Sequence, residues 1–266
     1  MAGGEDGTAA GAAADAVLTE VRDGVLLITL NRPEARNAVN LALAAGVAAA
    51  VERLEAEDDL RAGVITGAGK GFSSGMDLKA FLQGETPHAG GRGFAGICEL
   101  PPAKPMVAAV EGFAVAGGLE VALSCDMIVA GRSARLGIPE ARRGLIAGAG
   151  ALIRLPRRIP RHVAMGMALT GEVIDAARGY ELGLVNRVCA DGEAIGTALE
   201  VARAIAANGP LAVRVSKRIV DELVELPEAE AWARQEAYIE QIMESSDARE
   251  GAAAFAEKRD PVWTGT

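Results

Sequence analysis

Apolar residues in the first two-thirds of the chain fall into short β-prone runs separated by turn residues and helical patterns. The first two runs, residues 17–21 and Val25–Leu30, flank Asp23-Gly24, a dipeptide typical of the tight turn in a β-hairpin. Short apolar runs bounded by glycine, proline or polar residues are typical of buried strands. Three more such runs follow, at residues 64–66, Met106–Val110 and 127–130.

Helical patterns lie between these runs. Asn40 is a suitable N-cap for a helix over residues 41–57, in which apolar residues recur at near-helical spacing. Further helices are predicted to begin near Asp77 and at Gly117-Gly118. The polar stretch 83–93, rich in Gly and Pro, is predicted to be a mobile loop.

The end of the chain is mainly helical. From Ala149 onward one predicted strand, at 184–188, interrupts the helical pattern. The order predicts an α/β core of repeated strand-strand-helix units, placed at residues 16–205, followed by a helical subdomain at 206–266. Residues 1–15, rich in Ala and Gly, are expected to form a disordered tail.

The composition supports a folded protein and excludes several classes of function. Half of the 266 residues are hydrophobic, which is enough for a full core. The 27 Lys and Arg residues are outnumbered by 36 Asp and Glu, so no nucleic-acid partner is expected for a chain of net charge −9. No apolar stretch is long enough for a transmembrane helix, and we expect no membrane partner. The three cysteines cannot all pair and lack metal-ligand spacing, which favours a reduced, cytoplasmic setting without a bound metal.

The glycine-rich segment before residue 76 does not match a nucleotide-binding loop. The spacing from Gly63 to Gly69-Lys70 is one residue too long for a phosphate-binding P-loop. No third glycine completes a dinucleotide fingerprint after Gly67. Both nucleotide hypotheses are therefore rejected.

The same segment does contain the pattern of a hydrolase nucleophile elbow. Gly71-Phe72-Ser73-Ser74-Gly75 matches Gly-x-Ser-x-Gly, and Asp126 and His162 follow in the order used by α/β-hydrolases. An elbow follows its strand directly, whereas five residues separate Thr66 from Phe72. A serine esterase is therefore the weaker hypothesis.

The segment around Gly117-Gly118 offers the parts for proton chemistry beside a carbonyl. Glycines at a helix start expose backbone N–H groups at the positive end of the helix dipole. Glu120 lies on the same face about one turn further on. Taken alone, however, these residues favour the simpler explanation, in which the glycines permit close helix packing and Glu120 is solvated.

Glu140 is a second carboxylate in an apolar context, directly after Pro139. Its alternative explanation is a glutamate favoured by the helix dipole at a helix N-terminus. The spacing does not establish whether Glu120 and Glu140 meet.

An ordered set of motifs resembles the crotonase (enoyl-CoA hydratase/isomerase) superfamily over roughly residues 17 to 263. Single motifs in it are weak, but their order and spacing together are specific. The motifs are Asn31-Arg32-Pro33, Asn37-Ala38, Gly71-Phe72-Ser73-Ser74-Gly75-Met76-Asp77-Leu78, Gly117-Gly118-Leu119-Glu120, Pro139-Glu140, Leu169-Thr170-Gly171, Gly183-Leu184-Val185 and Phe255-Ala256-Glu257-Lys258-Arg259.

The resemblance implies a fold and a reaction. The fold is a spiral of ββα units with a C-terminal helical oligomerisation subdomain, and the ligand is an acyl-CoA thioester. Backbone N–H groups at Met76 and Gly117 match the family's oxyanion hole, where each donor contributes about 3 kcal/mol. Glu120 and Glu140 match the two glutamates of hydratases, with Glu140 donating a proton to C2 and Glu120 binding the attacking water. Two carboxylates in one dry pocket titrate as a coupled pair.

The resemblance also implies a binding site for coenzyme A. This is part of the substrate, so no separate cofactor is expected. Phe255 and Lys258 match a pair that reaches CoA from a neighbouring subunit, and trimers, or hexamers built from two trimers, are the implied assembly. A solvated surface lysine remains the alternative for Lys79. The residues matched to substrate or CoA binding are Arg36, Ala38, Ser73, Ser74, Asp77, Leu78, Lys79, Phe255 and Lys258.

The preferred function is therefore hydration of a 2-enoyl-CoA. The alternatives are a double-bond isomerase or an acyl-CoA dehydratase on the same fold, a non-enzymatic acyl-CoA-binding protein, and the serine esterase. The eight arginines from Arg132 to Arg161 are interpreted as a solvated or inter-subunit surface, and the alternative is a basic field that attracts the phosphates of CoA. His88, in the variable loop expected to cover the acyl chain, is interpreted as incidental.

Overall fold

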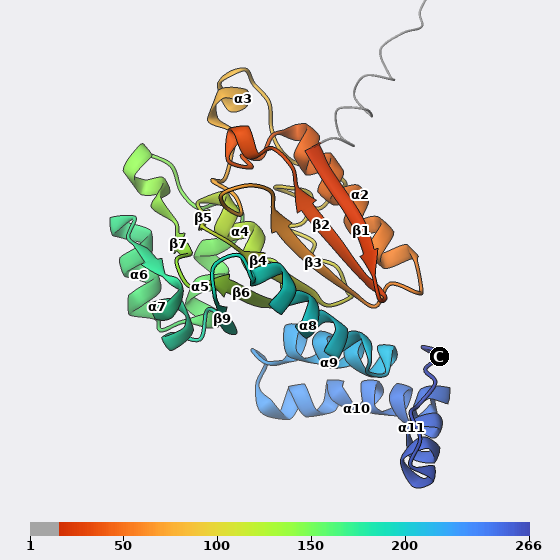
Figure 1. Ribbon diagram of the computed structural model, residues 1–266. Helices are drawn as coiled ribbons and strands as arrows, with labels where there is room; N and C mark the ends of the chain where they lie inside the picture. The colour runs from red at the N-terminus through yellow and green to blue at the C-terminus, as the bar shows by residue number, and fades with distance from the viewer. Residues whose placement is uncertain (1–15) are drawn as a thin grey trace, which may run out of the picture.

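A six-stranded sheet forms the centre of the protein in the computed structural model, which describes residues 16–266. Figure 1 shows its strands in the order β1-β2-β3-β4-β6-β9. Only β1 runs antiparallel to its neighbour; the other pairs are parallel. The strands are β1 (Val17–Arg22), β2 (Val25–Leu30), β3 (Ala62–Gly67), β4 (Met106–Val110), β6 (Met127–Gly131) and β9 (Arg187–Cys189).

The central strands divide their side chains between two apolar layers. In β2, Leu26, Ile28 and Leu30 belong to one core cluster, whereas Val25 and Leu27 belong to the other. This alternation follows from the two-residue period of a strand. Helix α2 (Leu41–Ala56) packs into the first layer, and α8 (Ala194–Ala206) covers the second against β3 and β4. Both faces of the central strands are therefore buried.

A second, small sheet carries the segments around the candidate site. It consists of β5 (Phe113–Val115), β7 (Arg135–Gly137) and β8 (Val173–Asp175), in the order β5-β7-β8. Three-residue strands give too little alternation to be predicted from sequence. The remaining elements of this region are the 3-10 turns η1 (Pro33–Ala35) and η2 (Pro139–Arg143) and the helices α3 (Leu78–Leu82), α4 (Gly117–Leu123), α5 (Ala151–Arg158), α6 (Arg161–Thr170) and α7 (Ala176–Glu181).

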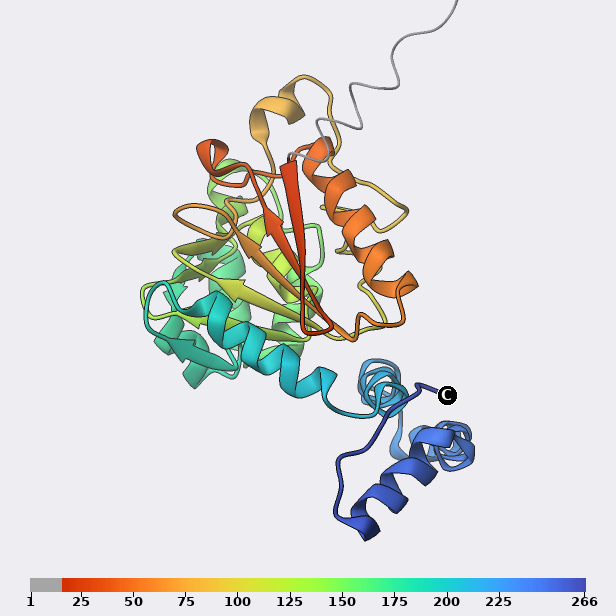
Figure 2. The same ribbon diagram turned by 45° about the vertical axis from the view of Figure 1, so that its right-hand side comes forward.

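The last three helices lie beside the body of the molecule, below α8 in Figures 1 and 2. They are α9 (Pro210–Leu223), α10 (Glu228–Glu244) and α11 (Ser246–Glu257). Helix α10 packs against both of its neighbours and contains no buried residue. The C-terminal segment returns to α8, where the Trp263 indole N–H donates to the carbonyl of Ala207 over 2.8 Å.

The predicted mixed α/β core followed by helices is confirmed. Asn40 caps α2 as expected, because its side chain accepts a hydrogen bond from the Leu43 N–H. The strand predicted at 184–188 is misplaced: β9 begins at Arg187, since Leu184 and Val185 turn back onto Gly179 through backbone hydrogen bonds. The domain boundary at residue 205 stays a prediction, and the predicted tail at 1–15 lies outside the described residues. Within residues 16–266, no helix has the length and apolar character to cross a bilayer.

Candidate active site

A pocket of about 580 Å³ opens at the N-terminal end of α4. Its wall is built from six stretches of chain: the end of η1, the loop before α3, the loop after it, the start of α4, η2 and the loop that leads into α5. The lining includes both candidate glutamates, Glu120 and Glu140, together with Met76 and Gly117. The structure therefore brings together the four residues assigned to chemistry.

Two backbone N–H groups lie close together at the start of α4. A Cβ built on Gly75 would lie 2.7 Å from the nitrogen of Gly117, so the chain at residues 75–76 runs directly against the first turn of the helix. Within residues 16–266, neither the N–H of Met76 nor that of Gly117 donates to a protein acceptor. Both are therefore available to an acceptor atom of a ligand.

The two segments are fixed by single parallel bridges, Val39 with Met76 and Ser73 with Ala114. Between β5 and α4 the chain turns at Ala116, which has φ 53° and ψ −133°. This conformation is normally reserved for glycine and carries backbone strain. The Ala116 N–H donates to the carbonyl of Gly137 over 2.9 Å, and this bond holds the turn in place.

Glu120 projects from the first turn of α4 and is only 3% exposed. One of its carboxylate oxygens, Oε1, accepts a hydrogen bond of 3.1 Å from the backbone N–H of Ala151, the first residue of α5. Burial raises the pKa of Glu120 to about 7, and the neighbouring charge of Glu140 also raises it, while the backbone donors oppose the shift. The alternative of a solvated Glu120 is therefore wrong.

Glu140 lies in the first turn of η2 and is 9% exposed. Among the described side chains, its Oε2 is a buried atom without a hydrogen-bond partner. Burial raises the pKa of Glu140, and the charge of Arg143 opposes the rise. A buried carboxylate oxygen without a partner carries a desolvation cost, which a ligand hydrogen bond would offset.

The raised pKa of Glu120 predicts a pH-dependent stability. The folded protein retains a proton on Glu120 at pH values where the unfolded chain has released it. This stabilising contribution is complete below pH 4.5, the ordinary pKa of a glutamate, and is lost as the pH rises through about 7. We expect Glu120→Gln to match the wild type at pH 4.5 and to have a free energy of unfolding about 1–3 kcal/mol higher at pH 8.

Denaturant unfolding of both proteins at one fixed concentration, across this pH range, measures the difference. Glu140→Gln should change the stability in the same direction, because burial raises the pKa of Glu140 too. A difference between Glu120→Gln and wild type that stays constant from pH 4.5 to 8 would contradict the assignment of a raised pKa to Glu120.

The residues matched to CoA binding divide into three groups. Arg36, Ser74 and Leu78 line the pocket. Ala38, Ser73 and Asp77 lie behind the wall and shape it: the Ala38 carbonyl accepts from Arg32, and Asp77 forms an ion pair of 3.1 Å with the same arginine. Asp77 also caps α3 through the N–H groups of Lys79 and Ala80.

The third group lies away from the pocket. Lys79 is exposed on α3 and is not part of the lining. Phe255, 87% exposed on α11, and Lys258, at the C-terminal cap of that helix, belong to the helical region below the sheet. Their matched role needs a neighbouring subunit and stays a proposal.

The serine esterase hypothesis is wrong on geometric grounds. Ser73 is fully buried, and its hydroxyl donates to the carbonyl of Asn37 over 2.8 Å and accepts from the Gly75 N–H. Asp126 accepts from the Met106 N–H and pairs with Lys217 on α9. His162 is an exposed residue of α6. Ser73 therefore shapes the loop before Met76.

Several residues of the pocket carry no signal in the sequence. His88, expected to be incidental, lines the pocket and forms an isolated antiparallel bridge with Phe94, which also lines it. Glu99 and the apolar pair Leu145 and Ile146 complete the wall on two sides. These residues belong to loops without periodicity, so sequence patterns do not mark them.

The arginine-rich segment is only in part the surface that the sequence predicts. Arg157 is exposed and pairs with Glu225 on the surface. Arg143 lines the pocket. Arg154 and Arg158, both half-buried on α5, donate to backbone carbonyls of the core.

The comparisons with known proteins agree with this architecture. Residues 20–266 match the family model described as enoyl-CoA hydratase/isomerase. The chain belongs to the enoyl-CoA hydratase/isomerase family. Within residues 16–266, no group of three or more His, Cys, Asp and Glu side chains is arranged to hold a metal ion.

Relatives in this family cover almost the whole chain. A crystal structure of a probable enoyl-CoA hydratase/isomerase from Mycobacterium abscessus is 56% identical, covers 95% of this chain and 100% of its own, and has a TM-score of 0.91. Enoyl-CoA hydratase EchA19 of Mycobacterium tuberculosis is 43% identical over 92% of this chain and 94% of its own. Carnitinyl-CoA dehydratase of Salmonella enteritidis is 39% identical over 92% of this chain and 97% of its own.

Proposed function

We propose that this member of the family is an enoyl-CoA hydratase, which adds water across the 2,3-double bond of a 2-enoyl-CoA thioester to give a 3-hydroxyacyl-CoA. One observation carries the proposal. Two buried carboxyl groups with raised pKa values line the same pocket as two backbone N–H groups without protein acceptors in the described part of the chain. The reaction needs an acid, a base and an oxyanion site, and the pocket offers all three.

The N–H groups of Met76 and Gly117 form the oxyanion hole of the proposed reaction. They bind the thioester oxygen, which gains negative charge as water adds at C3 and an enolate forms. Because the donors are fixed before the substrate arrives, they need no reorganisation during the reaction. The positive end of α4 adds to this field.

The two glutamates divide the proton transfers. Glu120 in its carboxylate form accepts a proton from the water that attacks C3, and the N–H of Ala151 orients this carboxylate. Glu140 in its carboxylic acid form delivers a proton to C2. The product gains a hydroxyl at C3 and a hydrogen at C2, so one water is consumed. Burial raises the pKa of both carboxyl groups, that of Glu120 to about 7, and the charge of Glu140 adds to the rise at Glu120.

Arg36 and Ser74 lie where the CoA portion leaves the pocket in this proposal, with Lys79 outside the wall as a further cation for its phosphates. Phe255 and Lys258 would contact the CoA of a neighbouring subunit. CoA belongs to the substrate, and the proposed reaction uses no separate cofactor. A cytoplasmic location stays part of the proposal, supported by three unpaired cysteines, two of which are buried.

Loss of the conjugated enoyl-thioester absorbance on incubation with a 2-enoyl-CoA tests the proposal. We expect loss of absorbance with formation of 3-hydroxyacyl-CoA, verified by mass spectrometry as a gain of one water. Migration of a double bond from a 3-enoyl-CoA without water addition would instead identify an isomerase. Binding without turnover would identify a binding protein.

Dehydration is a second candidate direction for the same machinery. A relative 39% identical over 92% of this chain is named carnitinyl-CoA dehydratase. The same acid and base serve both directions, because proton transfers are reversed step by step in the back reaction. The ratio of kcat/KM in the two directions is fixed by the equilibrium constant for each acyl group. A panel of short, long, branched and steroid-linked enoyl-CoA and 3-hydroxyacyl-CoA substrates therefore identifies the preferred acyl group by its kcat/KM.

We expect this chain to form trimers or hexamers in solution. The support is the exposed apolar side chains on the helices below the sheet, among them Trp232, Met243 and Phe255, which are 62%, 69% and 87% exposed. Light scattering at micromolar concentration should give three or six times the chain mass of 27.3 kDa. A monomer mass would contradict both the assembly and the role proposed for Phe255.

A further inference from the structure

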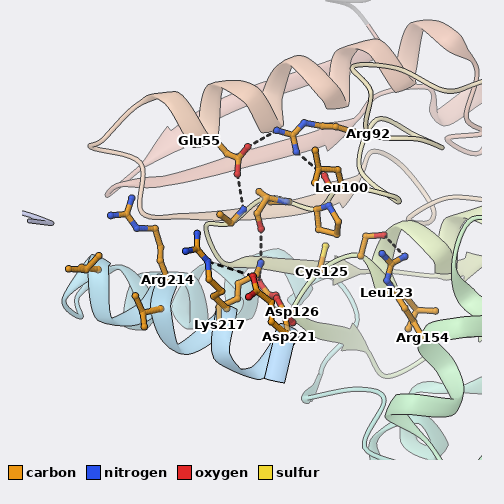
Figure 3. Close-up of a pocket in the computed structure, with 18 of the residues that line it drawn as sticks. Glu55, Arg92, Leu100, Leu123, Cys125, Asp126, Arg154, Arg214, Lys217 and Asp221 are labelled. Carbon is orange, nitrogen blue, oxygen red and sulfur yellow. Dashed lines mark hydrogen bonds and ion pairs between the residues drawn. The ribbon is translucent and has the colours of Figure 1, made fainter. Parts of the chain in front are cut away.

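A second cavity, of about 670 Å³, lies at the C-terminal end of α4, where Leu123 and Ser124 line it, whereas the active-site pocket lies at the N-terminal end. Residues close together in the chain line the two spaces. Glu99 lines the active-site pocket, and the next residue, Leu100, lines the second cavity. Glu120 lines the active-site pocket, and Ser124, one helical turn later, lines the second cavity. Figure 3 shows Arg154 at one end of this second cavity, apart from the Lys217–Asp126 ion pair. Arg154 lines the second cavity, and its side chain reaches the carbonyls of Ala149, which lines the active-site pocket, and of Cys98, which precedes another lining residue.

The guanidinium of Arg154 makes hydrogen bonds to three separate segments. Nη2 donates to the carbonyl of Cys98 over 2.6 Å. Nη1 donates to the hydroxyl of Ser124 over 3.4 Å and to the carbonyl of Ala149 over 3.5 Å. A Cβ built on Gly150 would lie 2.3 Å from this Nη1, so only glycine leaves room for the group there.

Each of the three segments bears on the position of Glu120. The Ser124 hydroxyl donates over 2.9 Å to the backbone carbonyl of Glu120, one helical turn before it in the chain. Ala149 is two residues before Ala151, whose N–H binds the Glu120 carboxylate. Cys98 precedes Glu99 in the pocket wall. The planar guanidinium of Arg154 therefore connects the end of α4, the loop before α5 and the wall of the pocket around the side chain of Glu120.

We propose that Arg154 is a positioning residue for Glu120, which holds the Glu120 carboxylate and the α5 N–H that orients it in the arrangement needed to bind the attacking water. Its positive charge acts in the same place, and lowers the pKa of Glu120 against the effect of burial. The inference on catalysis rests on the proposed hydratase function, whereas the inference on the Glu120 carboxylate does not.

Arg158 provides a matched control on the same helix. It lies one turn after Arg154, is also half-buried, and donates to the carbonyl of Cys125 over 2.9 Å. Cys125 follows Ser124 directly, but within residues 16–266 the Arg158 guanidinium has no hydrogen bond to the Ser124 hydroxyl, to the Ala149 carbonyl or to the Cys98 carbonyl. Arg158→Met therefore removes a half-buried guanidinium and its bond to the same stretch of backbone, and leaves the three hydrogen bonds of Arg154 in place.

The experiment compares Arg154→Met, Arg154→Lys and Arg158→Met with the wild type. We expect Arg154→Met to lower kcat about 10–100-fold with KM changed less than about threefold, because misplacement of a reacting group acts mainly on the chemical step. The acid limb of the kcat/KM profile should move to higher pH. Arg154→Lys retains the charge but loses the planar fork, so it should keep the limb in place and recover only part of kcat.

A titration of the Glu120 carboxyl by ¹³C NMR, in Glu140→Gln protein with and without Arg154→Met, gives a readout that needs no turnover. Arg154→Met should raise the midpoint, and Arg158→Met should not. If wild-type protein has no hydratase activity but the midpoint moves, the proposed function fails and the role of Arg154 stands. If Arg154→Met and Arg158→Met lower kcat equally and neither moves the midpoint, Arg154 is only a core contact and the inference is overturned.

Discussion

Replacing either of the proposed catalytic glutamates, Glu120 or Glu140, with glutamine is expected to lower kcat for hydration about 10²–10⁴-fold, with a smaller change in KM. The amide introduced by Glu140→Gln can neither hold nor deliver the proton for C2, and the amide introduced by Glu120→Gln cannot accept one from water. Both substitutions keep the size and one hydrogen-bonding oxygen of the original side chain, so the wall of the pocket is preserved. Initial rates with a 2-enoyl-CoA measure the effect.

The double variant provides the sharper measurement. Because the two carboxyl groups share one reaction, the losses should not add, and the double variant should be only modestly slower than the worse single one. Glu181→Gln, an exposed residue of α7 paired with Arg178, is the control for loss of a negative charge. Retention of wild-type kcat by Glu140→Gln would refute the proton-donor role, and unchanged Kd for a saturated acyl-CoA would show that the site is intact.

Removal of the Gly117 N–H is expected to lower kcat about 10²–10³-fold, the usual loss for one oxyanion donor. Gly117→Pro removes the N–H, and proline is sterically suited to the first position of a helix. A side chain there meets Phe94, because a Cβ on Gly117 would lie 2.6 Å from the ring. We therefore pair the substitution with Phe94→Leu, which makes room.

The matched control is Gly117→Ala with Phe94→Leu, which adds a side chain in the same place but keeps the N–H. The difference in kcat between the two double variants isolates the donor. Both should bind an S-alkyl-CoA thioether, which has no carbonyl oxygen, with the same Kd. If the two double variants have equal kcat values and equal affinity for the thioether, the Gly117 N–H does not donate to the thioester oxygen in the reaction.

The parts of the fold with strong local patterns are predictable. The run Val25–Leu30 is apolar at every position but one because both faces of β2 are buried, and Asn40 marks the start of α2 through its side-chain oxygen. The short strands β5, β7 and β8 are not predictable, since each has only three residues and is held by partners far along the chain. Their registers depend on tertiary contacts.

The candidate site shows the same division. Glu120 and Gly117 share one short motif, so their proximity follows from helix geometry. Glu140 lies 20 residues further on, and only the folded chain places it in the same pocket. Local sequence does not predict the hydrogen bond from Ala151 to Glu120 or the bonds of Arg154 to Ser124 and Cys98, because they join residues 30 to 56 positions apart. Only the bond from Arg154 to Ala149 is local among these four.

The strained conformation of Ala116 links the stability of the fold to the direction of the Gly117 N–H. A residue with a Cβ atom in this region of φ and ψ costs about 1–3 kcal/mol of stability, so the turn that orients the Gly117 N–H lowers the free energy of unfolding. Ala116→Gly would relieve this strain and would also widen the range of directions in which the Gly117 N–H can point. At this one residue, the free energy of unfolding and the fixed direction of the Gly117 N–H therefore oppose each other, because a gain in the first loosens the second.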